Sequence, residues 1–431
     1  RRAFLAGVMI FTLASVWCGF ASNIMHLIVA RALQGLGGAL LVPGSLAIIS
    51  ASFREQERGR AIGTWSGFTA ITAAIGPLLG GWLIEHISWR AVFFINVPLA
   101  LIVLFLSLRF LAESKDEIPG TKLDWLGATL TTLGLGAIVY ALIESTRLGL
   151  RHPAVLVTFV VGIFILLLFV RWEAQIRNPM LPPSLFRSRD FTGANILTFL
   201  LYAALGGTLF FLPLNLIQVQ GYSATAAGAA LLPFILLLFF LSRWGGGLVE
   251  RYGAKLPLVV GPLITSIGFS LFAIPGVGGS YWQTFFPAMV VLGLGMATSV
   301  APLTTTVMNS VAENRVGIAS GINNAISRAA GLLAIAALGI IMIDVFNRSL
   351  DQRLAMLALS PKLRETLDAE RSKLAAMTLP PEIAPATHAQ ITHAIHTSFV
   401  NGFRSVMLIG AALAIGSACT SLVLIHGKAD R

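Results

Sequence analysis

Long apolar segments separated by short polar ones run along the whole chain. Each apolar segment is close to the ~20 residues that a helix needs to cross about 30 Å of hydrocarbon. The segments are about twice as long as a barrel strand and lack its strict alternation, so helices are predicted. The pattern indicates an all-α polytopic membrane protein. Its twelve expected transmembrane helices lie at residues 3–22, 25–50, 61–84, 91–110, 124–145, 154–171, 191–217, 224–248, 256–275, 283–308, 316–345 and 401–426.

Composition excludes a water-soluble protein. Of the 431 residues, 56% are hydrophobic and only 11% are charged, and the mean hydropathy is +0.82, whereas soluble proteins have about 25% charged residues. The net charge of +11 comes from basic residues in the short loops, so we expect no nucleic-acid partner. Cys18 and Cys419 lie inside apolar segments and predict neither a disulfide framework nor a thiolate metal site.

The basic residues favour one orientation in the membrane. If residue 1 is cytoplasmic, nearly all Lys and Arg of the short loops fall on the cytoplasmic side, and only Arg90, Arg147 and Arg151 fall on the other. Cationic loops resist translocation. We therefore expect a multi-pass protein of the cell (inner) membrane with both ends cytoplasmic.

Residues 346–400 form a long polar segment between the last two spans, which this orientation places outside. His388, His393 and His396 cluster there, but no Cys or carboxylate has ligand spacing beside them, so a solvated loop is favoured over a metal site. We predict no metal and no cofactor. An amphipathic helix is expected from the spacing of Leu354, Leu357, Leu359, Leu363, Leu367 and Leu374, which precede Pro380, Pro381 and Pro385.

Three local patterns recur at a nearly constant separation, as in transporter halves related by duplication. Arg1 and Gly7 return as Lys255 and Gly261, 254 residues later. Residues 35–39, with Pro43 beyond, return as residues 293–297 with Pro302, and Glu57, Gly63 and Gly67 return as Glu313, Gly317 and Gly321. Two spans precede Lys255 in the second copy, whereas the first copy begins at Arg1. We therefore expect two further spans upstream of residue 1, and fourteen helices in the intact protein.

This repeat predicts a division of the chain into two bundles and a linker. Residues 1–111 are expected to form the N-terminal bundle, and residues 112–190 two linker transmembrane helices and a cytoplasmic loop. Residues 191–345 and 401–426 are expected to form a C-terminal six-helix bundle, with 346–400 as its extracytoplasmic loop.

Three motifs resemble those of one family. Residues 31–39, Arg-Ala-Leu-Gln-Gly-Leu-Gly-Gly-Ala, resemble the fourth-helix motif of the major facilitator superfamily, and residues 76–81, Gly-Pro-Leu-Leu-Gly-Gly, resemble its fifth-helix antiporter motif. Residues 246–255, Gly-Gly-Leu-Val-Glu-Arg-Tyr-Gly-Ala-Lys, are similar to its loop motif between the second and third helices. Within the superfamily, the chain resembles the fourteen-helix drug:proton antiporter family. The resemblance implies two six-helix bundles joined by two linker helices.

The same resemblance implies a secondary active transporter that exports amphipathic or cationic drugs in exchange for protons, by alternating access. Its expected partners are a small-molecule substrate, protons and the lipid bilayer; the sequence predicts no oligomeric state. An exporter or uniporter of a specific metabolite, such as a siderophore or an amino acid, remains open on the same fold. A membrane-embedded enzyme is a remote alternative, because the sequence has no HExxH, GxSxG, CxxC or GxxxxGKS pattern.

Arg31 is the leading candidate for a functional residue. It lies about seven residues into its span, where an arginine costs about 2.5–3.5 kcal/mol unless it finds a partner or water. The resemblance implies that it faces the central cavity and takes part in proton coupling, with Gln34 orienting it; the alternative is an arginine satisfied by backbone carbonyls. The equivalent position in the repeat is Met289, so the fold itself requires no cation here. The other polar residues expected to line the cavity are Arg328, Asn195, Tyr202, Asn215, Asn323 and Asn324.

Other residues have expected roles in packing and gating. Small residues allow helix backbones to approach closely in the membrane. By that reasoning the antiporter-motif packing residues are Gly35, Gly38, Gly67, Gly76, Pro77, Gly80 and Gly81, and the resemblance implies a cytoplasmic gating loop of Glu250, Arg251, Gly253 and Lys255. The proton-carrying acid is not placed, because Glu85, Glu144 and Asp344 all lie toward the outer ends of spans. The resemblance implies that this acid lies in the family's first helix, upstream of residue 1.

Overall fold

The computed structural model describes residues 1–52, 72, 75–111, 124–176, 179–312, 315–357, 359–380 and 383–427. Within these ranges every regular element is a helix, and eleven helices are long and apolar enough to cross a membrane. They coincide with eleven of the twelve predicted spans. The remaining span, 61–84, lies largely outside the described residues, although residues 75–86 are helical. The prediction of an all-α polytopic membrane protein is confirmed.

The chain divides into two compact units. Unit 1 comprises Arg1–Gly120 and Ser223–Leu232, and unit 2 comprises Thr121–Tyr222 and Pro233–Arg431. The two predicted linker helices therefore group with the second bundle. The first residues of the predicted span 224–248 group with unit 1 instead, because the short helix α9 (Ala224–Ala229) is separate from α10 (Leu232–Tyr252).

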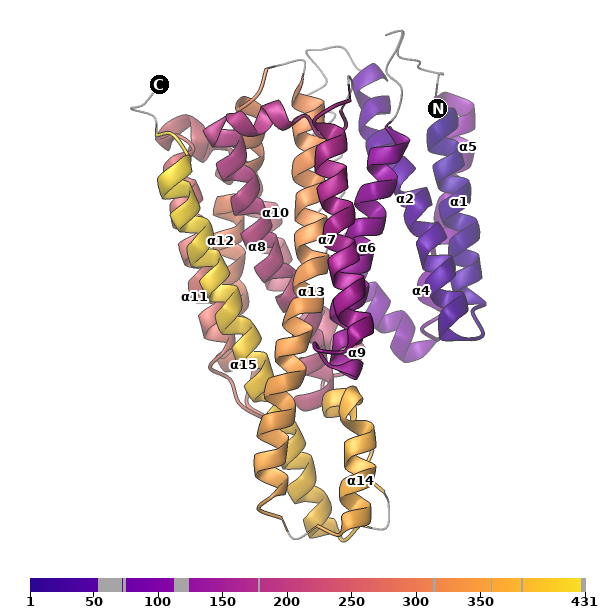
Figure 1. The fold of residues 1–431 in the computed structure, drawn as a ribbon, viewed down its shortest axis with the longest axis vertical. Coiled ribbons are helices and arrows are strands. Elements are labelled where there is room, and N and C mark those ends of the chain that lie inside the picture. Colours follow the sequence, from indigo (N-terminus) through magenta and orange to yellow (C-terminus); the bar gives the residue numbers. More distant parts are fainter. Residues whose placement is uncertain are drawn as a thin grey trace. The chain divides into compact units, whose positions relative to one another are not determined.

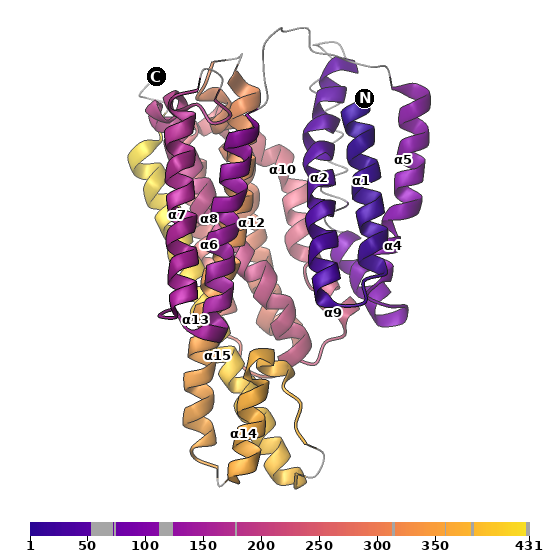
Figure 2. The same ribbon diagram turned by 45° about the vertical axis from the view of Figure 1, so that its right-hand side comes forward.

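In unit 1, α1 (Arg2–Gly19) packs against α2 (Ile24–Ser52), α4 (Ala91–Phe94) and α5 (Asn96–Phe110) (Figure 2). The predicted span 91–110 corresponds to one apolar helical span, Ala91–Phe110, in which Ile95 joins α4 to α5 with helical backbone angles. Polar contacts with α1 lie at this joint: Asn96 Nδ2 donates to Ser15 Oγ at 3.0 Å, and Ser15 Oγ donates to the carbonyl oxygen of Phe93 at 2.9 Å.

In unit 2, five helices pack around a core of buried side chains that includes Phe191, Phe269, Phe346 and Phe399. These helices are α8 (Arg189–Leu214), α11 (Lys255–Phe272), α12 (Tyr281–Asn309), α13 (Val316–Leu354) and α15 (Pro385–Leu424). The helix α8 continues as a π-helical turn, η2 (Asn215–Val219). The linker helices α6 (Trp125–Leu148) and α7 (Pro153–Glu173) pack on each other, and α6 also contacts α13 (Figure 1).

The predicted long loop contains more helix than expected, which corrects the predicted boundaries at 345 and 401. The helix α13 continues to Leu354 and α15 begins at Pro385, with α14 (Pro361–Glu370) and the 3₁₀ helix η4 (Arg371–Ala376) between them (Figure 1). The single amphipathic helix predicted from the leucine spacing is split. Its leucines nevertheless help form a small core with α15, because Leu354, Leu367 and Ile391 are buried. This packing explains why α13 and α15 extend beyond the apolar segments that predicted them.

The sequence repeat corresponds to the same helix crossing in each unit. In unit 1, α1 and α2 cross at Gly7 and Gly37, where a methyl group added at Gly37 would lie 2.9 Å from the carbonyl oxygen of Gly7. In unit 2, α11 and α12 cross at Gly261 and Gly295, and a methyl group at Gly295 would lie 2.9 Å from the carbonyl oxygen of Gly261. The repeat read from the sequence is therefore present in the packing of both units.

Candidate functional site

Arg31 lies on an exposed face of α2, and the side chain of Gln34 holds it there. Nη1 of Arg31 donates to Oε1 of Gln34 at 2.5 Å, while Gln34 itself is only 3% exposed. The thiol of buried Cys18 lies 3.9 Å from the same oxygen. The guanidinium also lies 5.9 Å from the ring centroid of Phe93. The expected contact between Arg31 and Gln34 is present, whereas its role in coupling stays a prediction.

The charge of Arg31 is available to interact with an acid that approaches it. No carboxylate of the described residues forms an ion pair with it, so its charge is held in place by a neutral amide and an aromatic face. A fixed cation of this kind stabilises the ionised form of any acid that approaches it. Arg31 can therefore lower the proton affinity of a mobile carboxyl group or substrate.

In unit 2, a buried polar network joins α8 to α13. Asn323 Nδ2 donates to Asn195 Oδ1 at 3.1 Å and to Thr198 Oγ1 at 2.6 Å, and Asn195 Nδ2 donates to the carbonyl oxygen of Phe191 at 2.8 Å. Asn195 and Thr198 are buried, and Asn323 is half-buried. Two of the predicted cavity residues, Asn195 and Asn323, are thus brought together, and Thr198 joins them although the sequence did not single it out.

The remaining predicted cavity residues do not join this network. Asn215 is buried in η2, where its Oδ1 accepts from Gln220 Nε2 at 3.1 Å. Tyr202 is half-buried on α8, and Asn324 and Arg328 are exposed on α13. Arg328 makes no hydrogen bond or ion pair with a described residue. The exposed pair therefore presents an amide and a cation on one helix, while Asn215 supports the fold of α8.

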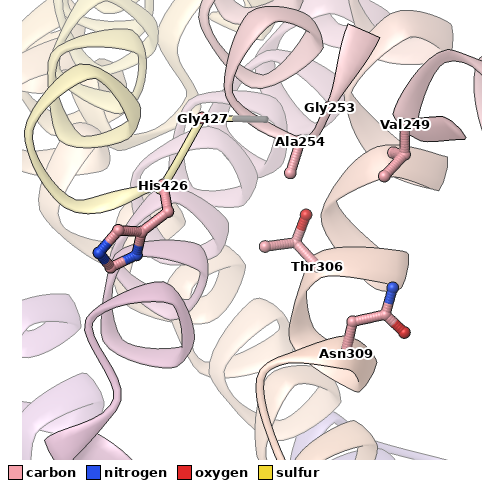
Figure 3. Close-up of a pocket in the computed structure, with 7 residues that line it drawn as sticks. All are labelled: Val249, Gly253, Ala254, Thr306, Asn309, His426 and Gly427. Atoms are coloured by element: carbon pink, nitrogen blue, oxygen red, sulfur yellow. The ribbon is translucent and has the colours of Figure 1, made fainter. Parts of the chain in front are cut away.

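A small pocket lies beside the predicted gating loop (Figure 3). It has a volume of about 170 Å³, below the ~300–1,000 Å³ typical of pockets for drug-sized ligands. It is therefore smaller than a typical pocket for a drug-sized ligand, and its lining comes from the loop, α12 and residues 426–427. The pocket is lined by Val249, Gly253, Ala254, Thr306, Asn309, His426 and Gly427.

Of the predicted gating-loop residues, Glu250 and Arg251 belong to the end of α10 and Lys255 to α11, and Gly253 lies in the tight turn between the two helices. Gly253 has φ +77°, a left-handed conformation that glycine adopts without strain. Arg251 is exposed, Lys255 begins α11, and the side chain of Glu250 lies outside the described residues. The loop geometry explains the requirement for Gly253, while the gating role of all four residues stays a prediction.

Among the described residues, the close contact between α1 and α2 falls on Gly37. Apart from the adjacent backbone of its own helix, no described atom lies within 4 Å of a methyl group added at Gly35, Gly38, Gly76 or Gly80, so their packing role stays a prediction. Gly37 faces α1 instead, and on a helix Gly38 and Gly35 are rotated by about 100° and 200° from it. Gly67 lies outside the described residues.

The predicted packing of Gly81 and Pro77 involves α9. A methyl group at Gly81 would overlap the carbonyl oxygen of Ala224, and one at Gly228 would overlap the carbonyl oxygen of Pro77. Oε2 of Glu85 accepts from Thr225 Oγ1 at 2.6 Å. Residues 75–86 and α9 are thus closely packed within unit 1.

The acids that the sequence singled out are not buried. Asp344 is exposed and forms an ion pair with Arg348 at 3.0 Å, and it lies inside α13, which continues to Leu354. The buried acid of the described residues is Glu173, at the end of α7, which the sequence did not single out. The sequence could have indicated the role of Asp124, which lies beside Glu173. An Asp directly before an apolar helical segment is a typical N-cap residue, whose side chain accepts from a backbone N–H two or three residues later.

Comparison with known proteins gives consistent results. Residues 1–335 match the family described as Major Facilitator Superfamily. The chain is 34% identical over 373 residues to the Multidrug resistance protein Stp of Mycobacterium tuberculosis, covering 85% of this chain and 68% of that protein. It is 29% identical to the Tetracenomycin C resistance and export protein of Streptomyces glaucescens, covering 100% and 80% of the two chains.

A solved structure shares the fold. It is a bacterial homolog to the human lysosomal transporter Spinster in an inward-facing and occupied conformation, with a TM-score of 0.59 and 16% identity. The match covers 98% of this chain and 81% of that chain.

Proposed function

The chain belongs to the Major Facilitator Superfamily, and on this basis we propose that it is a secondary active transporter that exports amphipathic or cationic drugs in exchange for protons. The observation that carries the proposal is the similarity, over most of the chain, to proteins named for multidrug resistance and for resistance and export. The proposal of alternating access is supported by the repeat between the two units, because two helices cross at a pair of glycines in each of them.

Proton coupling is supported by the geometry around Arg31. An exposed cation on an apolar helix, held by a buried amide and unpaired with any described carboxylate, is available to an acid that changes its protonation during transport. In this proposal Gln34 positions Arg31, and Arg31 favours release of the proton when the acid approaches it.

Breadth of substrate is supported by the neutral polar groups of unit 2. Amide and hydroxyl groups such as those of Asn195, Thr198 and Asn323 contribute hydrogen bonds without imposing a charge requirement. In this proposal buried Asn195 and Thr198 position Asn323, which lines the transport path beside the exposed side chains of Asn324 and Arg328, and an apolar compound with a few polar atoms is accommodated there. We also infer that both ends of the chain are cytoplasmic, as the distribution of basic residues favours.

The test is transport by the purified full chain in liposomes. Ethidium is the probe, and its exchange is measured with an imposed pH gradient, without one, and after an ionophore has collapsed the gradient. We expect accumulation only with the gradient. Exchange that is indifferent to the gradient would remove the antiport proposal and favour a uniporter; no exchange of ethidium or other lipophilic cations would favour an exporter of a specific metabolite. Protein-free liposomes are the control.

A further inference from the structure

A carboxyl group is buried at the end of the second linker helix. Glu173, the last residue of α7, is 1% exposed. Its Oε2 accepts from the backbone N–H of Leu181 at 2.8 Å. Its Oε1 is buried without a hydrogen-bond donor. A charged carboxylate in this position would leave one oxygen desolvated and unpaired, which is costly.

The second carboxyl group at this place belongs to Asp124, the N-cap of α6. Its side chain accepts from the backbone N–H of Gly127 at 2.9 Å and from the indole N–H of Trp172 at 3.0 Å. The carboxyl groups of Asp124 and Glu173 are in hydrogen-bonding contact. Both lie over Gly127, where an added methyl group would be 2.7 Å from Glu173 Oε1 and would overlap Asp124 Oδ2. The absence of a side chain at Gly127 makes room for the pair.

Among the described residues, no cation forms an ion pair with either carboxyl group. This holds for Arg171 on α7, Arg187 on η1 (Pro183–Arg187) and Arg315, the N-cap of α13. Lys122 and Arg177 lie outside the described residues. Two carboxyl oxygens in contact can form a hydrogen bond only when one of them carries a proton.

We propose that Asp124 and Glu173 form a proton-binding carboxyl pair that fastens the linker helices to the segment leading into α8. Asp124 is the ionised member because two N–H groups satisfy its charge. Glu173 carries the proton on Oε1 and donates it to Asp124, while its Oε2 holds Leu181. The pair thereby joins the start of α6, the end of α7 and residues 179–188.

The pair makes this junction sensitive to pH. When Glu173 releases its proton to a base in solution, two negative charges face each other and the hydrogen bond between them is lost. The repulsion separates the carboxyl groups and weakens the contact to Leu181. The junction is therefore closed at neutral pH and loosens as the pH rises, independently of whether transport is coupled to protons.

The first test is infrared difference spectroscopy of the full chain in lipid nanodiscs, between neutral and alkaline pH. We expect the C=O stretching band of a protonated carboxylic acid at neutral pH, its loss at alkaline pH, and its absence in Glu173→Gln. In Asp124→Asn, whose amide keeps the N-cap and can donate to Glu173, the band should be lost at neutral pH. Glu365→Gln, at an exposed position on α14, is the matched control and should retain it.

The second test is hydrogen exchange of residues 179–188. Glu173→Gln retains the acceptor for Leu181 and donates an N–H to Asp124 without needing a proton. After correction for intrinsic rates, we expect wild-type exchange in this segment to rise at alkaline pH, at least several-fold relative to Glu173→Gln. Identical carboxylic-acid bands or identical pH-dependent exchange in wild type and Glu173→Gln would overturn the proposal. Because neither readout uses transport, a failure here is distinguishable from a failure of the exporter proposal.

Discussion

The guanidinium of Arg31 lies 2.5 Å from the side-chain oxygen of Gln34, one helical turn further along α2. The two residues differ sharply in exposure, because Gln34 is buried and Arg31 is exposed. A buried amide thus limits the positions available to an exposed cation. This arrangement separates the residue that carries the charge from the residue that positions it, and mutation can test the two roles independently.

Replacing Arg31 by Ala should abolish proton-driven exchange while leaving expression near normal, because the charge is lost and no ion pair with a described residue is broken. Replacing Gln34 by Ala should retain the charge but lower the exchange rate by about tenfold to a hundredfold, since the guanidinium is no longer held in place. Exchange into liposomes measures both. Arg109→Ala, which removes an exposed arginine from α5, is the control and should exchange normally. Normal exchange by Arg31→Ala would reduce Arg31 to a packing residue.

The glycine crossings predict a stability difference between neighbouring positions. A methyl group at Gly37 would lie 2.5 Å from the backbone nitrogen of Phe11, whereas one at Gly35 has open space. Gly37→Ala should therefore destabilise the protein by about 1–3 kcal/mol, as overpacking generally does, and Gly295→Ala should do the same in unit 2. Thermal unfolding in detergent gives the comparison. If Gly35→Ala destabilises as much as Gly37→Ala, the crossing does not depend on close backbone contact.

The sequence predicted the membrane spans well because burial in lipid imposes a simple requirement, which is about twenty apolar residues in a helix. Its spans 91–110 and 224–248 correspond to the single apolar spans Ala91–Phe110 and Ala224–Leu241. However, it placed the end of α13 nine residues too early. The extension to Leu354 is stabilised by packing against α15 and η4, and such packing has no signature in a single hydrophobic segment.

The candidate site was predicted in part for a similar physical reason. Arg31 was identifiable because a cation within an apolar segment is unusual, and its contact with Gln34 follows from helical spacing. Glu173 was missed because its burial depends on two parts of the chain outside its own span. Asp124 is distant in sequence, and the chain near Leu181 lies beyond the end of α7. Thr198 was missed because one more hydroxyl in an apolar helix carries no signal without knowledge of Asn323.

Removing the amide of Asn323 should destabilise unit 2. The substitution Asn323→Ala leaves the Oδ1 of buried Asn195 without its donor, and an unsatisfied buried polar group costs about 1–3 kcal/mol. The adjacent substitution Asn324→Ala changes an exposed side chain and should stay within about 0.5 kcal/mol of wild type. Unfolding in detergent distinguishes them; equal effects would show that the network between α8 and α13 adds little.

The predicted orientation can be checked by labelling single cysteines introduced after Cys18 and Cys419 have been replaced by Ser. A cysteine at exposed Ser372, in η4, should react in intact cells with a maleimide that does not cross membranes. A cysteine at exposed Gln175, beyond the end of α7, should react only after the cells are opened. The reverse pattern would contradict the orientation read from the basic residues.

The segment between α13 and α15 should loosen in acid through Glu370. Its Oε1 accepts from Lys373 Nζ at 2.7 Å and its Oε2 from Thr378 Oγ1 at 3.0 Å. The bond from Lys373, followed by that from Thr378, holds the pKa of Glu370 below its ordinary value. Because the folded-state pKa is the lower one, the stabilisation is complete above the unfolded-state value, about 4.3. It is lost as the pH falls below that value toward the folded-state pKa.

Hydrogen exchange of residues 361–378 measures this dependence, after correction for the effect of pH on intrinsic rates. Wild-type protection should be constant near neutral pH and should decrease as Glu370 becomes protonated. Glu370→Gln should begin with lower protection at neutral pH and change less in acid, because its neutral amide accepts a weaker hydrogen bond from Lys373 and does not titrate. Glu365→Gln changes an exposed glutamate on the same helix and should follow the wild type. Equal acid sensitivity in Glu370→Gln and wild type would place the responsible group elsewhere, with the ion pairs of Arg371 to Asp351 and Asp368 as the next groups to substitute.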